Sequence, residues 1–256
     1  MAKGRKDSLY FTFGDNDSIG MGLRVRNFPN IPVAETHGKA VEIPGRDGDL
    51  WLADNSFKPV SIKIEFEISQ YGDFDAITAW LTGSGNLSLS VFEGYYWRAR
   101  VVKGFDFASG IFVSGYYRTT IEFVCQPFRY ESGDPVMEPI TSAGLFNGKG
   151  TWTAKPIITV NGSGNVNLMV NGASVLMTGI NGYMTLDCDA MMAYKGNTNM
   201  SPNVTIMSDD GAWPTLVPGS NSINWSVNAE DTGSTAEEVA ASSVTSVVIQ
   251  PNWRWR

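Results

Sequence analysis

The sequence predicts an all-β protein with a single helix, and three observations support this class. Short runs of alternating apolar and polar residues occur along most of the 256-residue chain, which is typical of strands with one buried face. The 27 glycines and 12 prolines fall largely between these runs, where they favour turns. Only one segment has apolar residues at helical spacing. Hydrophobic residues make up 43% of the chain, which is enough to build a core and excludes wholesale disorder.

The first half is expected to consist mainly of strands, and the clearest is 61–69. Ile62, Ile64 and Phe66 fall on one side of this segment, whereas Lys63 and Glu65 fall on the other. This pattern predicts one buried and one hydrated face. Further strands are predicted at 8–15, 21–28, 39–51 with a break at Pro44 and Gly45, 87–92, 96–107 and 115–128. The last two are expected to pair.

The helix is predicted within 71–85. Asp73 is placed to cap its first turn, and Gly83 is placed to end it. The residues that should pack on the sheet lie near one helical face; they are Phe74, Ile77, Trp80 and Leu81.

A boundary is expected between two domains, because 133–150 is rich in proline and glycine and has little periodicity. The predicted organisation is a first β domain at 1–132, a linker or crossing segment at 133–150, and a second β domain at 151–256. The second domain contains fewer charged residues than the first.

The second domain is expected to be a sandwich of short strands. Asn-Gly turns between alternating apolar runs predict hairpins at 161–164, 171–174 and 181–182. The acidic segment 228–242 has little that could be buried, so an exposed loop is expected there.

Charge and composition exclude several classes of function. The formal net charge of −7 disfavours a protein that grips DNA or an anionic membrane. No apolar run approaches the roughly 20 residues of a membrane span, and the first residues lack the apolar stretch of a signal peptide. Cys125 and Cys188 are too few for a disulfide framework or a zinc site and are expected to be buried thiols.

Candidate catalytic groups are weak, so we expect no enzyme and no cofactor. His37 is the single histidine and lies in a polar context beside glycine, so any Ser-His-Asp arrangement would depend on a residue expected in a loop. No phosphate-binding glycine motif is present. The acid pairs found anywhere in such a chain are too common to indicate glycoside hydrolysis.

The acid pairs also do not predict a metal site. Asp187 and Asp189 alternate and are expected to face the same side of a strand, while Asp209 and Asp210 precede a glycine. Two carboxylates are fewer than the 6–8 oxygen ligands that Ca²⁺ takes. An ordinary strand face and an ordinary turn are therefore expected.

Two aromatic patterns could serve binding. Trp213 and Trp225 could stack on sugar rings, which is the alternative function of a lectin-like module contacting host glycans, or they could simply pack in the core. Arg98 and Arg100 alternate beside Tyr96. Because the chain is acidic, contact with an acidic partner is a better interpretation of that strand than nucleic-acid binding.

Four segments together resemble a known family. They are the turn and strand at 42–68, the helix end and strands at 80–101, the strand "FVCQPFRY" at 123–130, and the segments "WPTLVPGSNSINW" and "VVIQPNWRW" near the end. Their order is similar to that in the distal tail proteins of long-tailed, non-contractile bacteriophages, and the resemblance covers nearly the whole chain.

This resemblance implies a structural virion protein rather than an enzyme. In the family, a tail-tube-like β domain with one helix forms a homohexameric ring around a DNA channel, and a galectin-like β-sandwich lies outside the ring. The implied partners are other copies of the chain, the tail tube protein, the tail-tip hub protein and a receptor-binding protein. DNA passes only in transit, and no membrane partner is implied.

The turn at 44–48 is a candidate subunit contact. Proline and glycine force the turn, so that a charged pair is displayed at its tip. A ring needs a head-to-tail interface, and charges on a rigid turn can set its register. The predicted interface residues are Pro44, Gly45, Arg46, Asp47 and Gly48.

Overall fold

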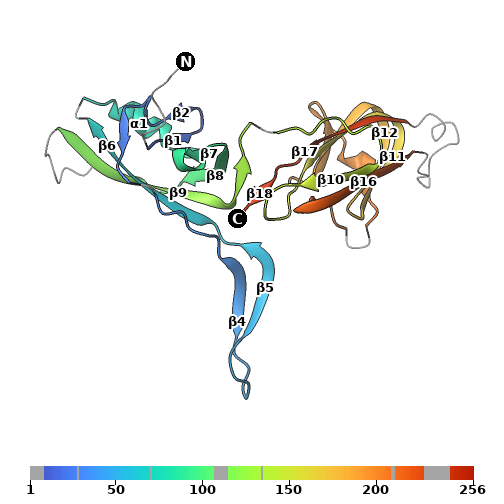
Figure 1. Cartoon of the computed structure of the whole chain (residues 1–256), viewed down its shortest axis with the longest axis horizontal. Coiled ribbons are helices and arrows are strands. Elements are labelled where there is room, and N and C mark those ends of the chain that lie inside the picture. Colours follow the sequence, from blue (N-terminus) through green and yellow to red (C-terminus); the bar gives the residue numbers. More distant parts are fainter. Residues whose placement is uncertain are drawn as a thin grey trace. The chain divides into compact units, whose positions relative to one another are not determined.

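The computed structural model describes residues 9–27, 29–69, 71–106, 115–133, 135–208, 211–227 and 243–256, apart from the side chain of Asn55. The chain divides into two compact units (Figure 1). Unit 1 comprises residues 1–130 together with Arg256, and unit 2 comprises residues 131–255. The predicted loop at 228–242 and the pair Asp209 and Asp210 lie outside the described residues.

Unit 1 is built on one mainly antiparallel sheet. The order of its strands is β2-β1-β7-β8-β9-β6-β3. Their bounds are β1 Phe11–Phe13, β2 Asn16–Asp17, β3 Leu23–Val25, β6 Val60–Ser69, β7 Gly83–Leu89, β8 Tyr95–Val101 and β9 Tyr116–Glu131. The predicted pairing of the two long strands is confirmed, because β8 and β9 are neighbours.

The alternation in 61–69 is confirmed as the centre of the core. Ile62, Ile64, Phe66 and Ile68 are fully buried, and they pack with β9 residues such as Phe123. The segment predicted as a strand at 87–92 differs from the prediction, since β7 begins earlier and a short 3₁₀ turn, η1 (Ser90–Phe92), follows it.

The single α-helix, α1 (Phe74–Trp80), is confirmed with its predicted cap. The side chain of Asp73 accepts a hydrogen bond from the backbone N–H of Ala76 at 2.9 Å. Trp80 stacks on the ring of Phe11 at 5.5 Å between centroids and donates its indole N–H to the carbonyl of Phe13. These contacts fix the helix on the sheet.

Unit 2 is an antiparallel β structure around a second core. The path through its sheet is β10-β16-β11-β12-β13-β14, while β15 pairs with β12 and β17 pairs with β11. The bounds are β10 Gly144–Gly148, β11 Ile157–Val170, β12 Ala173–Asp187, β13 Met192–Lys195, β14 Thr198–Asn199, the 3₁₀ turn η2 Ser201–Asn203, β15 Val204–Ile206, β16 Gly219–Val227, β17 Ser243–Gln250 and β18 Arg254–Trp255.

The expectation of short strands in this unit is wrong for its centre. β11 and β12 are 14 and 15 residues long and form one hairpin. Its turn lies at Asn171 and Gly172, both with positive φ, as the Asn-Gly signal predicted. The other two Asn-Gly segments are not turns, because Gly162 and Gly182 lie opposite each other within the hairpin.

These paired glycines mark the place where the hairpin changes partners. Up to Ser163, β11 pairs with β17, and from Val166 onward it pairs with β16. The register with β12 shifts between Gly164 and Val166, and such a bulge bends a strand. Both halves of the hairpin contribute to the same core, for example through Val160 and Leu168.

The segment expected to be a linker contributes structure to unit 2. The N–H groups of Met137 and Ile140 donate to the carbonyls of Ile249 and Val247, and β10 pairs along its whole length with β16.

Candidate assembly interface

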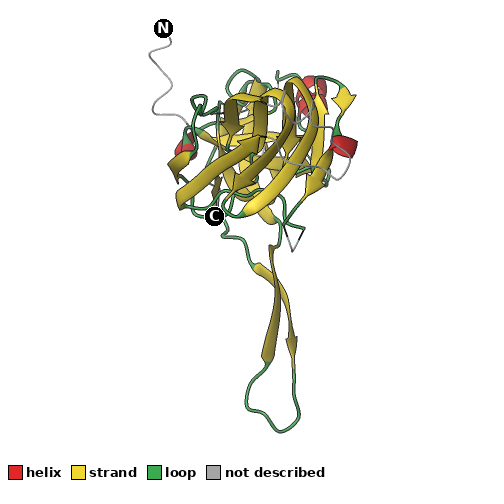
Figure 2. Cartoon of the chain, turned by 90° about the vertical axis from the view of Figure 1, so that its right-hand side faces the viewer, coloured by secondary structure: helices red, strands yellow, loops and turns green. Residues whose placement is uncertain are grey.

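The strands β4 (Thr36–Val41) and β5 (Leu50–Phe57) form a two-stranded sheet of their own. We call residues 36–57 the arm. Figures 1 and 2 show it leaving the sheet of unit 1 as a ribbon that ends in a loop. None of the arm side chains that the structure describes is buried. An isolated two-stranded hairpin is at best marginally stable in water, so the arm is suited to packing against a partner.

One face of the arm is aliphatic. In the register of the two strands, Val41 lies opposite Leu50 and Lys39 lies opposite Leu52. Opposite residues share a face of the sheet, so Val41, Leu50 and Leu52 form an apolar group. Leu52 is 54% exposed, and Ile43, beyond the end of β4, is also exposed. We call this group the aliphatic face.

The other face carries an aromatic ring. Trp51 lies opposite Ala40, and Gly38 lies opposite Ala53. A Cβ atom on Gly38 would come within 2.7 Å of the Trp51 ring, so the ring can lie against the backbone only because residue 38 has no side chain. Trp51 is 53% exposed. Large apolar groups exposed on both faces are typical of a surface that is covered in an assembly.

The end of the arm nearest unit 1 is held by polar contacts. The ring Nδ1 of His37 lies 2.7 Å from Oδ2 of Asp54. The pKa of Asp54 is lowered to about 2, because its carboxylate accepts hydrogen bonds from the hydroxyl and the backbone N–H of Ser56, with a further contribution from His37. His37 therefore lies in a strand rather than in the expected loop, and its contact with Asp54 bridges the two strands.

The predicted interface residues lie at the tip of the arm. Gly45 and Gly48 have φ values of 81° and 75°, which glycine adopts readily. The N–H of Arg46 donates to the carbonyl of Ile43 at 3.1 Å, and Pro44, Arg46 and their neighbours are exposed. Their role in a subunit contact remains a prediction.

The two candidate sugar-stacking residues lie in unit 2 and pack against its core. Trp213 and Trp225 are both half-buried and contact the buried cluster. Trp225 lies in β16 opposite Leu168 of β11. Each ring therefore has a packing role, whether or not its exposed part also contacts a ligand.

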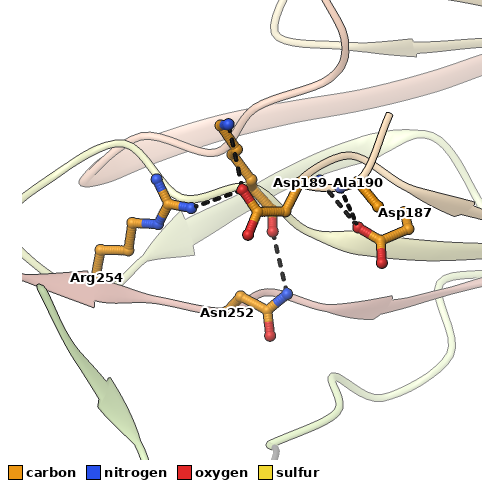
Figure 3. A network of polar contacts seen from close by, with 6 residues as sticks. Asp187, Asp189, Ala190, Asn252 and Arg254 are labelled. Carbon is orange, nitrogen blue, oxygen red and sulfur yellow. Dashed lines mark hydrogen bonds and ion pairs between the residues drawn. The ribbon is translucent and has the colours of Figure 1, made fainter. Parts of the chain in front are cut away.

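Asp187 and Asp189 do not share a strand face, contrary to the prediction. β12 ends at Asp187, whose carboxylate accepts the backbone N–H groups of Asp189 and Ala190 and so caps the following turn. Figure 3 shows Asp189 directed instead at Arg254, whose guanidinium donates to it at 3.2 Å. Lys155 forms a second ion pair with the same oxygen. The two aspartates thus stabilise the turn after β12.

The strand with Arg98 packs against aromatic residues of unit 1. The Arg98 guanidinium lies 4.5 Å from the centre of the Tyr130 ring, and Tyr96 stacks on that ring at 5.5 Å. Both groups therefore have intramolecular partners, whereas Arg100 is exposed.

The described residues offer neither a metal cluster nor a membrane helix. Among them, no group of three or more histidine, cysteine, aspartate or glutamate side chains is arranged to hold a metal ion. In that same part of the chain, no helix is both long and apolar enough to cross a membrane.

Sequence reasoning located the tip of the arm but missed Trp51 and Leu52. Their signal was present, since the run 50–53 is apolar directly after a turn. The alternation of apolar and polar residues cannot show whether another layer of the protein covers a hairpin. Here no described side chain of the arm is buried.

Comparison with known proteins agrees with this fold. The sequence matches no protein-family model and no curated protein at a significant level. Among solved structures, the chain is similar to the SPP1 Dit (gp 19.1) protein, described as a paradigm of the hub adsorption apparatus in phages that infect Gram-positive bacteria. The TM-score is 0.66 at 14% identity, over 95% of this chain and 98% of that one. The chain therefore has the fold of the SPP1 Dit protein, which confirms the resemblance to distal tail proteins predicted from its motifs.

Proposed function

We propose that the chain is a structural protein of a phage tail tip. Copies of it assemble into a ring-shaped hub, a homohexamer, which joins the tail tube to the tail-tip and receptor-binding apparatus. The ring leaves a central channel for DNA. The protein is made in the host cytoplasm and functions in the virion.

The observation that carries this proposal is the solitary arm with exposed apolar groups on both faces. A head-to-tail ring needs two different surfaces on each copy, one of which docks on the other surface of the next copy. The arm supplies a surface of this kind. The fold shared with the Dit protein supports the same role.

The remaining parts of the proposal concern the two units. Unit 1 forms the ring as a tail-tube-like domain and contacts the tail tube protein and the tail-tip hub protein. Unit 2 is a galectin-like sandwich, with a receptor-binding protein as a further partner. A net charge of −7 suits a channel through which DNA slides without binding.

The test is the solution mass of the full chain, measured by light scattering behind a sizing column across a concentration series. A species near six times the 27.9 kDa chain mass is expected. Leu52→Ser, which makes the aliphatic face more polar, is expected to shift the population towards monomer. Losing one exposed leucine from an interface corresponds to about 1–2 kcal/mol per contact, which is roughly five- to thirtyfold in each dissociation constant.

Leu145→Ser is the matched control, because Leu145 is 76% exposed but lies in β10 of unit 2. It should leave the mass unchanged. The proposed role of the arm is contradicted if both variants assemble like the wild type. A wild type that stays monomeric at every concentration would contradict self-assembly of the isolated chain, and the mass would then be measured with the tail tube protein present.

A further inference from the structure

We call residues 34–35 and 57–58, where the arm joins the rest of unit 1, the root of the arm. The chain enters the arm after Glu35 and leaves it at Phe57. Across this root, the N–H of Lys58 donates to the carbonyl of Glu35 at 2.9 Å. The side chains of Lys58 and Glu35 also form an ion pair, but it is exposed, and such pairs contribute little to stability.

Phe57 connects the root to the sheet of unit 1. Its ring meets the ring of Phe128 edge to face, with 5.6 Å between the centroids. Phe128 lies in β9 and is buried. Ala34, on the entering side, is also buried. The root is thus the part of the arm that has a fixed place on the body of unit 1.

Arg256 contacts both sides of this root. Its guanidinium carbon lies 4.5 Å from the centre of the Phe57 ring, within the range of a cation–π interaction. The same guanidinium donates from Nη2 to the carbonyl of Ala34 at 2.9 Å. Figure 1 shows the C mark beside the point where the arm begins. A residue far from Phe57 in the sequence therefore ties the entering segment to the leaving strand.

We propose that Arg256 is a latch that fixes the arm in the direction needed for docking. Because no described side chain of the arm is buried, its orientation depends on the contacts at its root, those of Phe57 and Arg256. A planar guanidinium suits this role, since it stacks on an aromatic ring while donating a directed hydrogen bond. Arg256 is a positioning residue for the assembly surface, and this role rests on the proposed function of the arm.

The test is hydrogen–deuterium exchange of the full chain at a concentration where it is dissociated. Arg256→Ala is expected to speed exchange of root amides, such as the N–H of Lys58, roughly two- to fivefold. This is the fold-change that corresponds to one exposed cation–π contact. Arg256→Lys keeps the charge and a donor but loses the planar group, so it should restore only part of the protection.

Arg100→Ala is the matched control, because Arg100 is an exposed arginine of β8 in the same unit. In the Arg100→Ala variant, the root amides should exchange at the same rate as in the wild type. The proposal is overturned if the root amides exchange equally fast in Arg256→Ala and in the wild type. It is also overturned if Arg256→Ala and Arg100→Ala speed this exchange by the same factor. Failure of the ring proposal is distinguishable, because it would appear as an unchanged mass in Leu52→Ser while the exchange difference at the root persisted.

Discussion

The two cysteines show how burial controls the reactivity of a single side chain. Cys125 and Cys188 lie in the cores of units 1 and 2, as the sequence predicted. Burial raises the pKa of each thiol to about 12, and in Cys188 the nearby carboxylates of Asp187 and Asp189 contribute in the same direction. Since the thiolate is the reactive form, neither residue is suited to redox or nucleophilic chemistry at neutral pH.

This gives a direct prediction for thiol labelling. At pH 8 an aromatic disulfide reagent should react with the native protein at least roughly a hundredfold more slowly than with the protein in denaturant. The reason is that a raised pKa leaves a smaller fraction of each thiol as thiolate at pH 8. Both cysteines should react once the chain is unfolded. Labelling followed by absorbance measures this, and rapid reaction of one native thiol would show that its core opens readily.

His37 illustrates the limit of reading chemistry from one residue. The sequence predicted a loop for this residue, but it lies in β4, where its contact with Asp54 of β5 bridges the two strands of the arm. Its geometry could be obtained only after the two strands were paired, because the residues that contact each other are 17 positions apart.

At the scale of elements, the sequence was sufficient to predict those helices and strands that depend on residues close together in the chain. The helix follows from Asp73 and the spacing of its apolar residues, and β6 follows from strict alternation. Turn signals were less informative. The sequence at 171–172 forms a hairpin turn, whereas the same dipeptide at 181–182 lies within a strand, since the outcome depends on the register with β11 and on neighbouring strands.

In the arm, too, local sequence predicts one feature, and another depends on how the strands pair. Proline and glycine located its tip, but the faces on which Trp51 and Leu52 lie depend on the register of β4 against β5. Whether another layer covers those faces is a tertiary property, so it could not be obtained from alternation.

The close approach at Gly162 supplies a prediction for the long hairpin. A Cβ atom there would come within 2.0 Å of the carbonyl oxygen of Ser243 in β17. Gly162→Ala should therefore force the backbone of one strand to shift and destabilise the protein by about 1–3 kcal/mol. Urea unfolding followed by tryptophan fluorescence measures this change.

Gly144→Ala is the matched substitution for that experiment. Gly144 also lies in a strand of unit 2, but a Cβ atom there would have no described neighbour within 4 Å, and its φ is not positive. It should leave the free energy of unfolding nearly unchanged. If Gly162→Ala were equally neutral, β17 would not approach β11 closely at this point.

At the scale of the whole molecule, the two kinds of interface chemistry on the arm make different predictions. The aliphatic face and Trp51 favour an association driven by burial of apolar surface. The tip displays Arg46 and Asp47, which could set the register of a contact by charge. The proposed ring could use both, but only one can dominate its stability.

Salt separates these contributions. Between 0.1 and 1 M NaCl the screening length falls from about 10 Å to about 3 Å, which weakens exposed charge pairs and leaves apolar contacts intact. Because each face of the arm exposes a large apolar side chain, Leu52 on one and Trp51 on the other, we expect the assembly measured by light scattering to keep its mass over this range. Dissociation at high salt, together with a loss of mass in Arg46→Ala at low salt, would instead show that the charged tip holds the ring together and that the apolar faces of the arm contact some other component of the tail.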